Sequence, residues 1–399
     1  MLRFGSSKTL AVTLLVCAST LLQPFAAWAE NGSPDRDDDE DVVLSFSTVG
    51  DSRQDLTNPD PTTLPLSGQD AIWLQNTKAW SRIVDSIEKQ KSNFLFFNGD
   101  MIMGYGNATI PADTSTVAGI VSSDLMKFYR QYGFWRGMVA GLMEKGTYVV
   151  PVPGNHETQC KSCGKKAQLV NENAWRANMG DLILDNTRML TLFGEQATNE
   201  NVANNAFYDG LATDQSKLSY SFDFRDSHFV VVNTDPAGKD SHAPVAWLAD
   251  DLAKAQAHGA KHFFVFGHKP AYTYYYGAGL SAPLPAKPAG LDADVAARDR
   301  FWDVIEQYGA TYFCGHEHTF NMNQPRAAQG GKAWQILVGS GGSPFEASPS
   351  DATVNPSTDR DYAWATVKVY QNGKVKIKAY GFDDHYGPTQ VIKSVTLSK

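Results

Sequence analysis

The chain has 399 residues, of which 42% are hydrophobic and 20% are charged, and its formal net charge is -8 at pH 7. A net negative charge argues against a protein that binds nucleic acid or anionic lipid, because those partners are themselves negatively charged. After residue 29, no segment of the sequence is apolar enough to span a membrane.

The first 29 residues have the features of a secretory signal peptide. Arg3 and Lys8 give a basic start, residues 10–22 are mostly apolar, and residues 27–29 form an A-x-A cleavage site. A transmembrane helix is the alternative, but polar residues interrupt the apolar run before it reaches the ~20 residues that a span needs. We therefore expect export to the periplasm or the extracellular space. Residues 30–41 are mainly Gly, Ser, Pro and acidic residues, which predicts a disordered tether.

The rest of the chain alternates between β-branched or aromatic runs, which predict strands, and stretches with helical spacing of apolar residues. Strands are expected at 42–48, 94–97, 147–152, 218–224, 228–232, 262–266, 310–314, 334–338, 366–370 and 374–380. Helices are expected at 70–91, 125–145, 246–257 and 294–308. The last two strands are joined by Gln371-Asn372-Gly373, a hairpin signal. The pattern predicts an α/β fold with two stacked sheets and helices outside.

Five short segments place metal-ligand residue types directly after apolar runs. They are Gly50-Asp51-Ser52-Arg53, Asn98-Gly99-Asp100, Gly154-Asn155-His156-Glu157, Gly267-His268 and Gly315-His316-Glu317-His318. Residues that follow neighbouring strands of an α/β sheet lie at one edge, where they can meet at a single point. Because the segments are spread along most of the chain, we expect residues 42–399 to form a single domain, with insertions around 104–145 and 158–216.

In this order the five segments resemble the motifs of the calcineurin-like metallophosphoesterase superfamily, which includes purple acid phosphatases and many exported bacterial phosphatases. The similarity covers about residues 42–345. It implies a four-layer αββα sandwich, in which two stacked mixed sheets are flanked by helices. It also implies a dinuclear metal site that cleaves phosphoesters.

The resemblance assigns a role to each candidate ligand. Asp100 would bridge two metal ions. The other ligands are divided between the ions, the first being held by Asp51 and His318 and the second by Asn155, His268 and His316. Imidazole, carboxylate and amide ligands without thiolates suit Zn, Mn or Fe, as divalent or mixed-valence ions. The two ions would activate a bridging hydroxide that attacks phosphorus in line with the leaving oxygen.

Two further residues are candidates for catalysis. His156 is similar to the family's outer-sphere histidine, which would contact the phosphate and protonate the leaving alkoxide, consistent with a pKa near neutrality. Glu157 would orient it. Arg53 departs from the family pattern, because most members have His two residues after the first Asp and arginine cannot bind a metal.

Purple acid phosphatases also lack that His, but they supply Tyr three residues after the bridging Asp. This chain has Met103 there, and Tyr105 lies two residues later. We therefore expect the first ion to have fewer protein ligands, to bind more weakly and to lack the purple tyrosinate-iron colour. Arg53 would either hold the substrate phosphate with a bidentate fork or form a salt bridge with Asp55 or another carboxylate, and the sequence leaves both open.

The cysteines after the signal segment are expected to be structural. Cys160 and Cys163 predict a small disulfide loop, with a redox centre as the less favoured alternative. Cys314 ends an apolar run and is predicted to be a buried thiol. The remaining histidines are expected at the surface or in packing roles; they are His228, His242, His258, His262 and His385.

Three other segments have two interpretations each. Residues 233–235 would either support the metals from behind the ligands or cap a strand. Residues 339–342 are all Gly or Ser and would either let backbone approach the ligands closely or form a turn. The tyrosines that follow His268 would line the substrate pocket or pack against an insertion; they are Tyr272, Tyr274, Tyr275 and Tyr276.

The sequence therefore favours an exported phosphomonoesterase that acts on small-molecule phosphoesters, without a nucleic-acid partner and without membrane attachment once the signal is removed. A phosphodiesterase or nucleotidase on the same scaffold is the nearest alternative, because the motifs do not separate these activities. A non-catalytic module that binds metal or a phosphate ligand is less favoured, and the departure at Arg53 is its main support.

Overall fold

The computed structural model describes residues 41–54, 77–204, 209–275, 287–346 and 359–397. Asp41–Lys399 cluster as one compact unit. The predicted signal peptide, residues 30–40 of the predicted tether, and residues 70–76 of the predicted first helix lie outside the described residues. Among the helices that the structure describes, none has the length and apolarity needed to cross a membrane.

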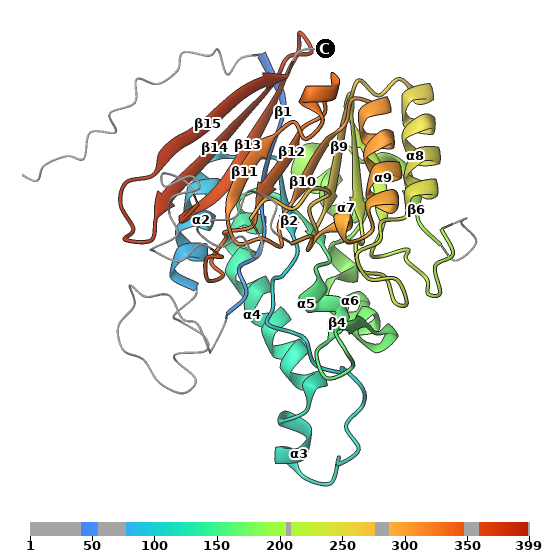
Figure 1. The fold of residues 1–399 in the computed structure, drawn as a ribbon. Helices are drawn as coiled ribbons and strands as arrows, with labels where there is room; N and C mark the ends of the chain where they lie inside the picture. The colour runs from blue at the N-terminus through green and yellow to red at the C-terminus, as the bar shows by residue number, and fades with distance from the viewer. Residues whose placement is uncertain (1–40, 55–76, 205–208, 276–286, 347–358, 398–399) are drawn as a thin grey trace, which may run out of the picture. The chain divides into compact units, whose positions relative to one another are not determined.

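The first sheet has six strands in the order β15-β14-β13-β1-β2-β3 (Figure 1). Their bounds are β1 Val42–Val49, β2 Phe94–Asn98, β3 Tyr148–Val152, β13 Asp361–Tyr370, β14 Val375–Asp383 and β15 Gln390–Leu397. β1, β2 and β3 run parallel, and β13 joins β1 in antiparallel pairing. Every residue of β2 and β3 is buried, as is typical of parallel strands that are covered on both faces.

The second sheet has seven strands in the order β11-β12-β10-β9-β8-β7-β6. Their bounds are β6 Thr198–Val202, β7 Tyr220–Phe224, β8 Ser227–Val232, β9 His262–Gly267, β10 Thr311–Cys314, β11 Phe320–Asn323 and β12 Gln335–Val338. The central strands β8, β9, β10 and β12 are parallel, and the outer strands are antiparallel. A separate short hairpin pairs β4 Gln159–Cys160 with β5 Lys166–Ala167.

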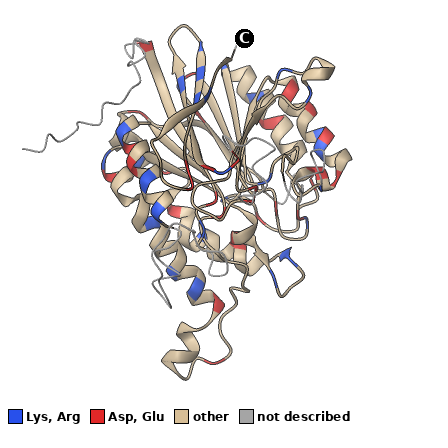
Figure 2. Ribbon diagram, turned by 60° about the vertical axis from the view of Figure 1, so that its left-hand side comes forward, with Lys and Arg blue, Asp and Glu red and all other residues tan. Residues whose placement is uncertain are grey.

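Helices fill the connections between the strands. The α-helices are α2 Thr77–Gln90, α3 Val117–Val121, α4 Asp124–Glu144, α5 Asn155–Thr158, α6 Leu169–Met179, α7 Asn186–Phe193, α8 Val245–His258 and α9 Val295–Gln307. Short 3-10 turns occur at η2 Gly180–Leu182, η3 Leu291–Ala293 and η4 Ala327–Gln329. Charged residues lie mostly on these helices and on the connecting loops, whereas the sheet strands are largely uncharged (Figure 2).

The two sheets stack face to face through aromatic side chains. Phe46 of β1 lies 4.9 Å from Phe264 of β9, and Phe96 of β2 stacks on Phe266 of β9 with ring centroids 3.8 Å apart. Phe229 of β8 packs against Phe96 at 5.1 Å. Each fully buried aromatic ring of this kind contributes roughly 1.5–3 kcal/mol from removal of apolar surface from water. These contacts hold the strand ends of both sheets in a fixed relation.

Helices cover the outer face of each sheet. Trp80 of α2 and Trp135 of α4 both pack on Phe97 of β2, at 5.1 Å and 5.0 Å. On the second sheet, Trp247 of α8 and Trp302 of α9 belong to a buried cluster on the outward faces of β8, β9 and β10. The layers therefore run helix, sheet, sheet, helix (Figure 1), and the predicted αββα sandwich is confirmed.

The predicted strands and helices recur with ends shifted by a few residues, but five strands are additional: the short pair β4 and β5, and the strands β6, β11 and β15. β6 has the polar sequence Thr-Asn-Glu-Asn-Val, and most residues of β15 are exposed. Both are outermost strands, where one neighbour suffices to satisfy the backbone and no apolar run is needed. β11 has only four residues and follows directly on the last metal-ligand segment. Propensity and periodicity carry little signal for strands of these kinds.

Candidate metal centre

The candidate ligands all follow the carboxyl ends of parallel strands. In the first sheet, Asp51 follows β1, Asp100 follows β2, and Asn155 begins α5 just after β3. In the second sheet, His268 follows β9, and His316 and His318 follow β10. Backbone hydrogen bonds join the two sheets at this edge, including Gly50 N to Val338 O at 2.8 Å. The six side chains that the sequence predicted as ligands are therefore brought to one place.

Asp100, His268, His316 and Asn155 surround one space, which we call the second pocket because these are the predicted ligands of the second ion. His268 Nε2 lies 3.2 Å from Asp100 Oδ1 and 2.8 Å from Asn155 Oδ1. His316 Nδ1 lies 2.9 Å from the same Asn155 oxygen. One nitrogen or oxygen from each of Asp100, His268 and His316 lies within 4.8 Å of the others, so these side chains can share an ion.

Asp51, Asp100 and His318 surround an adjoining space, which we call the first pocket. One ligand atom from each lies within 4.8 Å of the others, and His318 Nε2 is 3.6 Å from Asp51 Oδ1. Asp51 Oδ1 is buried and has no hydrogen-bond partner. Because Asp100 belongs to both groups, it is placed to bridge two ions.

Hydrogen bonds from the imidazoles show that the pockets fit a metal. His268 Nδ1 lies 2.8 Å from the carbonyl oxygen of Asn98, and His318 Nδ1 lies 2.5 Å from that of Pro344. A carbonyl oxygen only accepts, so each Nδ1 carries a proton and the Nε2 lone pair faces its pocket. This second interaction on the ring is the arrangement expected around a metal-binding histidine.

The charge states agree with cation binding. Burial raises the pKa of Asp51 well above its usual range, and repulsion from Asp100 raises it further. Burial likewise raises the pKa of Asp100 to about 7 and lowers the pKa of His268 to about 4. Buried carboxylates close together, facing neutral imidazoles, need a positive charge between them. Divalent cations would supply it.

The loops that carry the ligands are held in unusual conformations. Asp51, Asp100 and His316 have φ values of 61°, 56° and 75°, a region that non-glycine residues rarely adopt. Two glycines allow the close approach: a Cβ at Gly99 would lie 2.6 Å from His268 Nδ1, and one at Gly315 would lie 2.2 Å from Asp51 Oδ2. Strain of this kind clusters at functional sites.

Glu157 has a different role from the predicted one. Its buried carboxylate accepts hydrogen bonds from the backbone N–H groups of Asp100, Met101 and Gly154, at 2.9, 2.8 and 2.8 Å. It therefore fixes the loop that carries Asp100. The ring of His156 is oriented by Met103, whose carbonyl oxygen accepts from His156 Nδ1 at 2.5 Å.

His156 Nε2 consequently faces the pockets, 3.7 Å from Asp100 Oδ2. The sequence suggested a pKa near neutrality for His156, and the surroundings of the ring act against it. Burial, together with the positive charge of Arg53, lowers the pKa of His156 well below its usual range.

Arg53 lies inside the first pocket. Its Nε is 3.8 Å from Asp100 Oδ2, its Nη2 is 3.4 Å from His318 Nε2, and its Nη1 donates to Met103 Sδ at 3.5 Å. The side chain is 11% exposed. Asp55, the alternative partner, lies outside the described residues. The described contacts place the guanidinium among the ligand atoms.

Tyr105 lies beside the second pocket. Its hydroxyl accepts a hydrogen bond from Asn155 Nδ2, and its ring centroid is 3.8 Å from that of His156. Lys161 N donates to the carbonyl oxygen of Tyr105 at 2.8 Å. Lys161 lies in the loop closed by the disulfide of Cys160 and Cys163. The predicted disulfide is confirmed, and Cys314 is buried and free, as predicted.

Sequence analysis missed two groups near the site. Lys269, next to His268, forms a buried ion pair with Asp235 at 2.6 Å and donates to Ser241 Oγ at 2.8 Å. Glu346 Oε1 lies 3.7 Å from His318 Nδ1, and burial raises the pKa of Glu346 to about 7. Lys269 was detectable as a lysine adjoining a ligand motif. Glu346 gave no such signal, because it lies outside all five segments.

The structure bears on the three segments for which the sequence left two interpretations each. Asp235 pairs with Lys269, so residues 233–235 do more than end a strand. Gly341 N donates to Gly50 O at 2.9 Å, and a Cβ there would lie 2.4 Å from that oxygen, which requires close backbone approach. Glu317 accepts from the backbone N–H groups of Tyr274 and Tyr275, and so holds this tyrosine segment against the metal loop. Tyr276 lies outside the described residues.

The five remaining histidines lie outside the two ligand groups, and His228 forms ion pairs with Asp223 and Asp251, a role that the sequence did not predict. His228 and His262 are buried, His242 is half-buried, and His258 and His385 are exposed.

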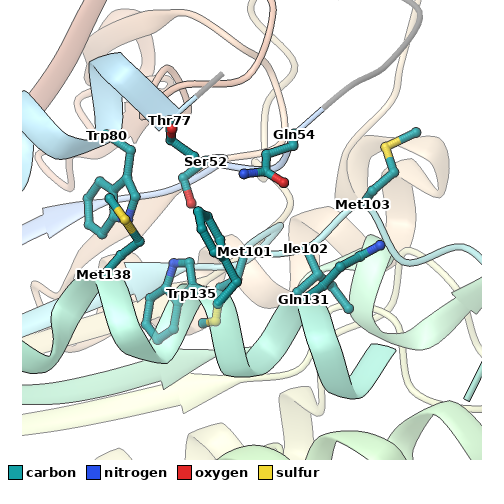
Figure 3. Close-up of a pocket in the computed structure, with 11 residues that line it drawn as sticks. Ser52, Gln54, Thr77, Trp80, Met101, Ile102, Met103, Gln131, Trp135 and Met138 are labelled. Atoms are coloured by element: carbon teal, nitrogen blue, oxygen red, sulfur yellow. The ribbon is translucent and has the colours of Figure 1, made fainter. Parts of the chain in front are cut away.

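An apolar pocket adjoins the loops of the first pocket (Figure 3). Ser52, Met101 and Met103 contribute from the metal-site loops, and Trp80 and Trp135 contribute from α2 and α4. Its volume is about 70 Å³. This pocket places apolar surface beside charged ligands.

Comparison with known proteins agrees with this geometry. A family model described as calcineurin-like phosphoesterase matches residues 73–320. That range contains all the candidate ligands except Asp51. No curated protein sequence matches the chain.

Two solved structures are similar in fold. One is a purple acid phosphatase, PPD1, isolated from yellow lupin (Lupinus luteus) seeds, with 15% sequence identity and a TM-score of 0.53 over 89% of this chain and 53% of that chain. The other is a dimetal phosphatase from Danio rerio, with 12% identity and a TM-score of 0.47 over 89% of this chain and 99% of that one. This chain thus spans about half the length of the lupin protein. The family model covers well over half of the chain, and two ligand groups meet at the strand ends. The chain therefore belongs to the calcineurin-like phosphoesterase family.

Proposed function

We propose that the protein hydrolyses phosphomonoesters of small molecules at a dinuclear metal site. The observation that carries this proposal is the meeting of two ligand groups that share Asp100. When bound, two divalent ions would supply an activated water and neutralise charge on the phosphate. Metal dependence and phosphoester chemistry follow from the family, and the choice of a monoester belongs to this proposal.

His156 and Arg53 are the residues that we assign to the substrate. His156 Nε2 faces the pockets because its Nδ1 is bound to the Met103 carbonyl oxygen. A bound phosphate dianion would raise the pKa of His156, since a nearby anion favours the protonated ring, and would let it protonate the leaving oxygen. Arg53 would bind phosphate oxygens through its guanidinium fork.

Loss of the shared ligand tests the proposal. We expect the wild-type protein, purified with metal, to hydrolyse p-nitrophenyl phosphate faster than bis-(p-nitrophenyl) phosphate. A chelator should abolish the activity. Asp100→Asn and His316→Ala should each reduce it more than about 100-fold, because even residues behind a metal ligand typically contribute about 10- to 100-fold.

Asp250→Asn makes the same chemical change at an exposed position of α8, where Asp250 pairs with Lys254, and should leave activity unchanged. Full activity in Asp100→Asn would refute the site. Faster cleavage of the diester would replace the monoester assignment with a phosphodiesterase.

We also propose that the protein is exported, on the basis of residues 1–29. Expression of the full chain in a bacterial host, followed by cell fractionation, should recover a shortened protein outside the cytoplasm. A full-length cytoplasmic product would contradict export.

A further inference from the structure

The first pocket already contains a positive charge. The Arg53 guanidinium approaches two of its three ligand residues, at 3.8 Å from Asp100 Oδ2 and 3.4 Å from His318 Nε2. The side chain is only 11% exposed, so water screens this charge little. An ion in this pocket would have to share the Asp100 carboxylate with the guanidinium.

The second pocket has a different electrostatic setting. The cation nearest to it in sequence is Lys269, which is held in the buried pair with Asp235 at 2.6 Å and by Ser241 Oγ at 2.8 Å. The charge of Lys269 is therefore balanced by a carboxylate outside the ligand set. His268 and His316 present nitrogens to Asn155 Oδ1 at 2.8 and 2.9 Å.

The two pockets also differ in the number of side chains that they offer as ligands. The second pocket offers four side chains, whereas the first offers three, and both use Asp100. A missing ligand and a neighbouring like charge both weaken cation binding. Only the repulsion depends on the charge of Arg53, so substitutions can separate the repulsion from the effect of the missing ligand.

We propose that Arg53 acts as a fixed cation within the first pocket, so that the protein binds one metal ion tightly in the second pocket and another weakly in the first. This inference rests on the dinuclear site of the proposed function. Beyond that function, we infer that the ion in the first pocket exchanges readily and that the charge of Arg53 is the main cause of its weak binding. The same guanidinium would also contact substrate phosphate, whose negative charge would compensate both positive charges.

A purely structural role for Arg53 predicts a different result. If the arginine only neutralised Asp51 and Asp100 to stabilise the fold, its removal would destabilise the metal-free protein without strengthening either metal site. Metal affinity therefore separates the two interpretations.

The test is calorimetric titration of the metal-free full chain with Zn²⁺ or Co²⁺, without substrate. We expect the wild type to show two dissociation constants that differ by about tenfold or more, as repulsion between close charges would produce. Arg53→Lys keeps the charge and should keep the difference. Arg53→Leu removes the charge without adding a ligand, and should tighten the weaker site by about tenfold while leaving the tighter one unchanged.

Arg53→His adds an imidazole and should tighten the weaker site further. If Arg53→Leu does not fold, as shown by circular dichroism, the comparison of Arg53→Lys with Arg53→Met decides, because Arg53→Met also removes the charge and keeps a long side chain. Arg136→Leu is the matched control, because Arg136 pairs with Asp181 on the insertion and contacts neither pocket.

Two equal sites in the wild type would overturn the inference. So would an unchanged or weaker first site in Arg53→Leu, or in Arg53→Met where that variant decides. Because no substrate is used, a protein without phosphoesterase activity would refute the proposed function while still giving a clear answer on Arg53.

Discussion

At the scale of single residues, Asn155 shows how a neutral side chain is directed at a metal. Its Oδ1 faces the nitrogens of His268 and His316 at 2.8 and 2.9 Å. Its Nδ2 donates to the hydroxyl of Tyr105, which fixes the amide with its oxygen toward the second pocket. Tyr105 therefore positions the ligand Asn155 and does not take its place at the metal.

Tyr105→Phe removes this hydrogen bond and keeps the ring against His156. We expect the affinity for the tighter ion to fall about 10- to 100-fold, the usual effect of losing a partner behind a metal ligand. Competition with a chromophoric chelator measures the affinity, and the absorption spectrum of the Co²⁺-loaded protein should shift as the ligand geometry loosens.

Tyr148→Phe serves as the control, because it also deletes a buried hydroxyl, bound there to the Leu182 carbonyl oxygen. Equal losses of metal affinity in the two variants would argue against a specific role for Tyr105.

Residues of this kind could not be predicted from the sequence. Asp51, Asp100 and His268 were recognisable because each follows an apolar run and a glycine. Tyr105 and Glu346 carry no such local mark, and their positions depend on which loops meet after folding. The same limit explains the wrong assignment of Glu157, whose position next to His156 in the chain suggested a contact that the loop does not make.

At the scale of elements, a buried ionic cluster joins three strands of the second sheet to helix α8. His228 on β8 lies between Asp223 on β7, at 2.5 Å, and Asp251 on α8, at 2.9 Å. Asn199 and Asn201 on β6 donate to the same two carboxylates, at 2.6 and 2.7 Å. This polar edge strand is thus held by side chains as well as by backbone pairing.

Because of this cluster, the stability of the fold should fall as the pH becomes alkaline. Burial alone would lower the pKa of His228, but its hydrogen bonds to Asp223 and Asp251 raise it to about 9. Because the unfolded value is about 6.5, the stabilisation is complete below pH ~6.5 and is lost as pH rises through about 9. We expect the free energy of unfolding, measured in urea, to fall by about 3 kcal/mol over this interval.

His228→Gln should cost about 3–5 kcal/mol at pH 6, since it leaves two buried carboxylates without their cation. It should also remove most of the alkaline slope. His258→Gln, at an exposed position at the end of α8, should change neither quantity. A wild-type protein whose stability is flat between pH 6.5 and 9 would contradict the role of the cluster.

Elements were predictable where packing and local pattern agree. The sequences of β2 and β3 are apolar runs, and both strands are buried throughout. The buried face of α2 contains Ala79, Trp80, Ile83 and Ile87 at helical spacing. β6 and β15 were missed because polar edge strands are defined by their neighbours and not by their own composition.

At the scale of the whole molecule, the metal centre joins the two sheets. Asp51, Asp100 and Asn155 come from the first sheet, and His268 and the pair on the last motif come from the second. Ions held between them would link the layers at their strand ends, in addition to the aromatic contacts between the sheets.

Metal should therefore stabilise the fold by mass action. At a free metal concentration about 100 times the dissociation constant, the free energy of unfolding should rise by about 2.7 kcal/mol. Thermal unfolding with metal and with chelator measures this gain. Asp100→Asn removes the shared ligand and should lose most of it; an equal gain in that variant would show that the metal binds elsewhere.

The four-layer arrangement was predictable because alternating strands and helices allow few packings, and the resemblance in the five motifs selected one. The sequence alone did not show that an arginine would lie between Asp100 and His318. That placement depends on the turn after β1, where Asp51 has a φ of 61°.

Anomalous X-ray scattering from crystals saturated with zinc or manganese tests the central claim most directly. The account predicts two metal peaks per chain, one among Asp51, Asp100 and His318 and one among Asp100, Asn155, His268 and His316. Peaks at other positions, or no peak at these side chains in a protein that still hydrolyses phosphoesters, would contradict it.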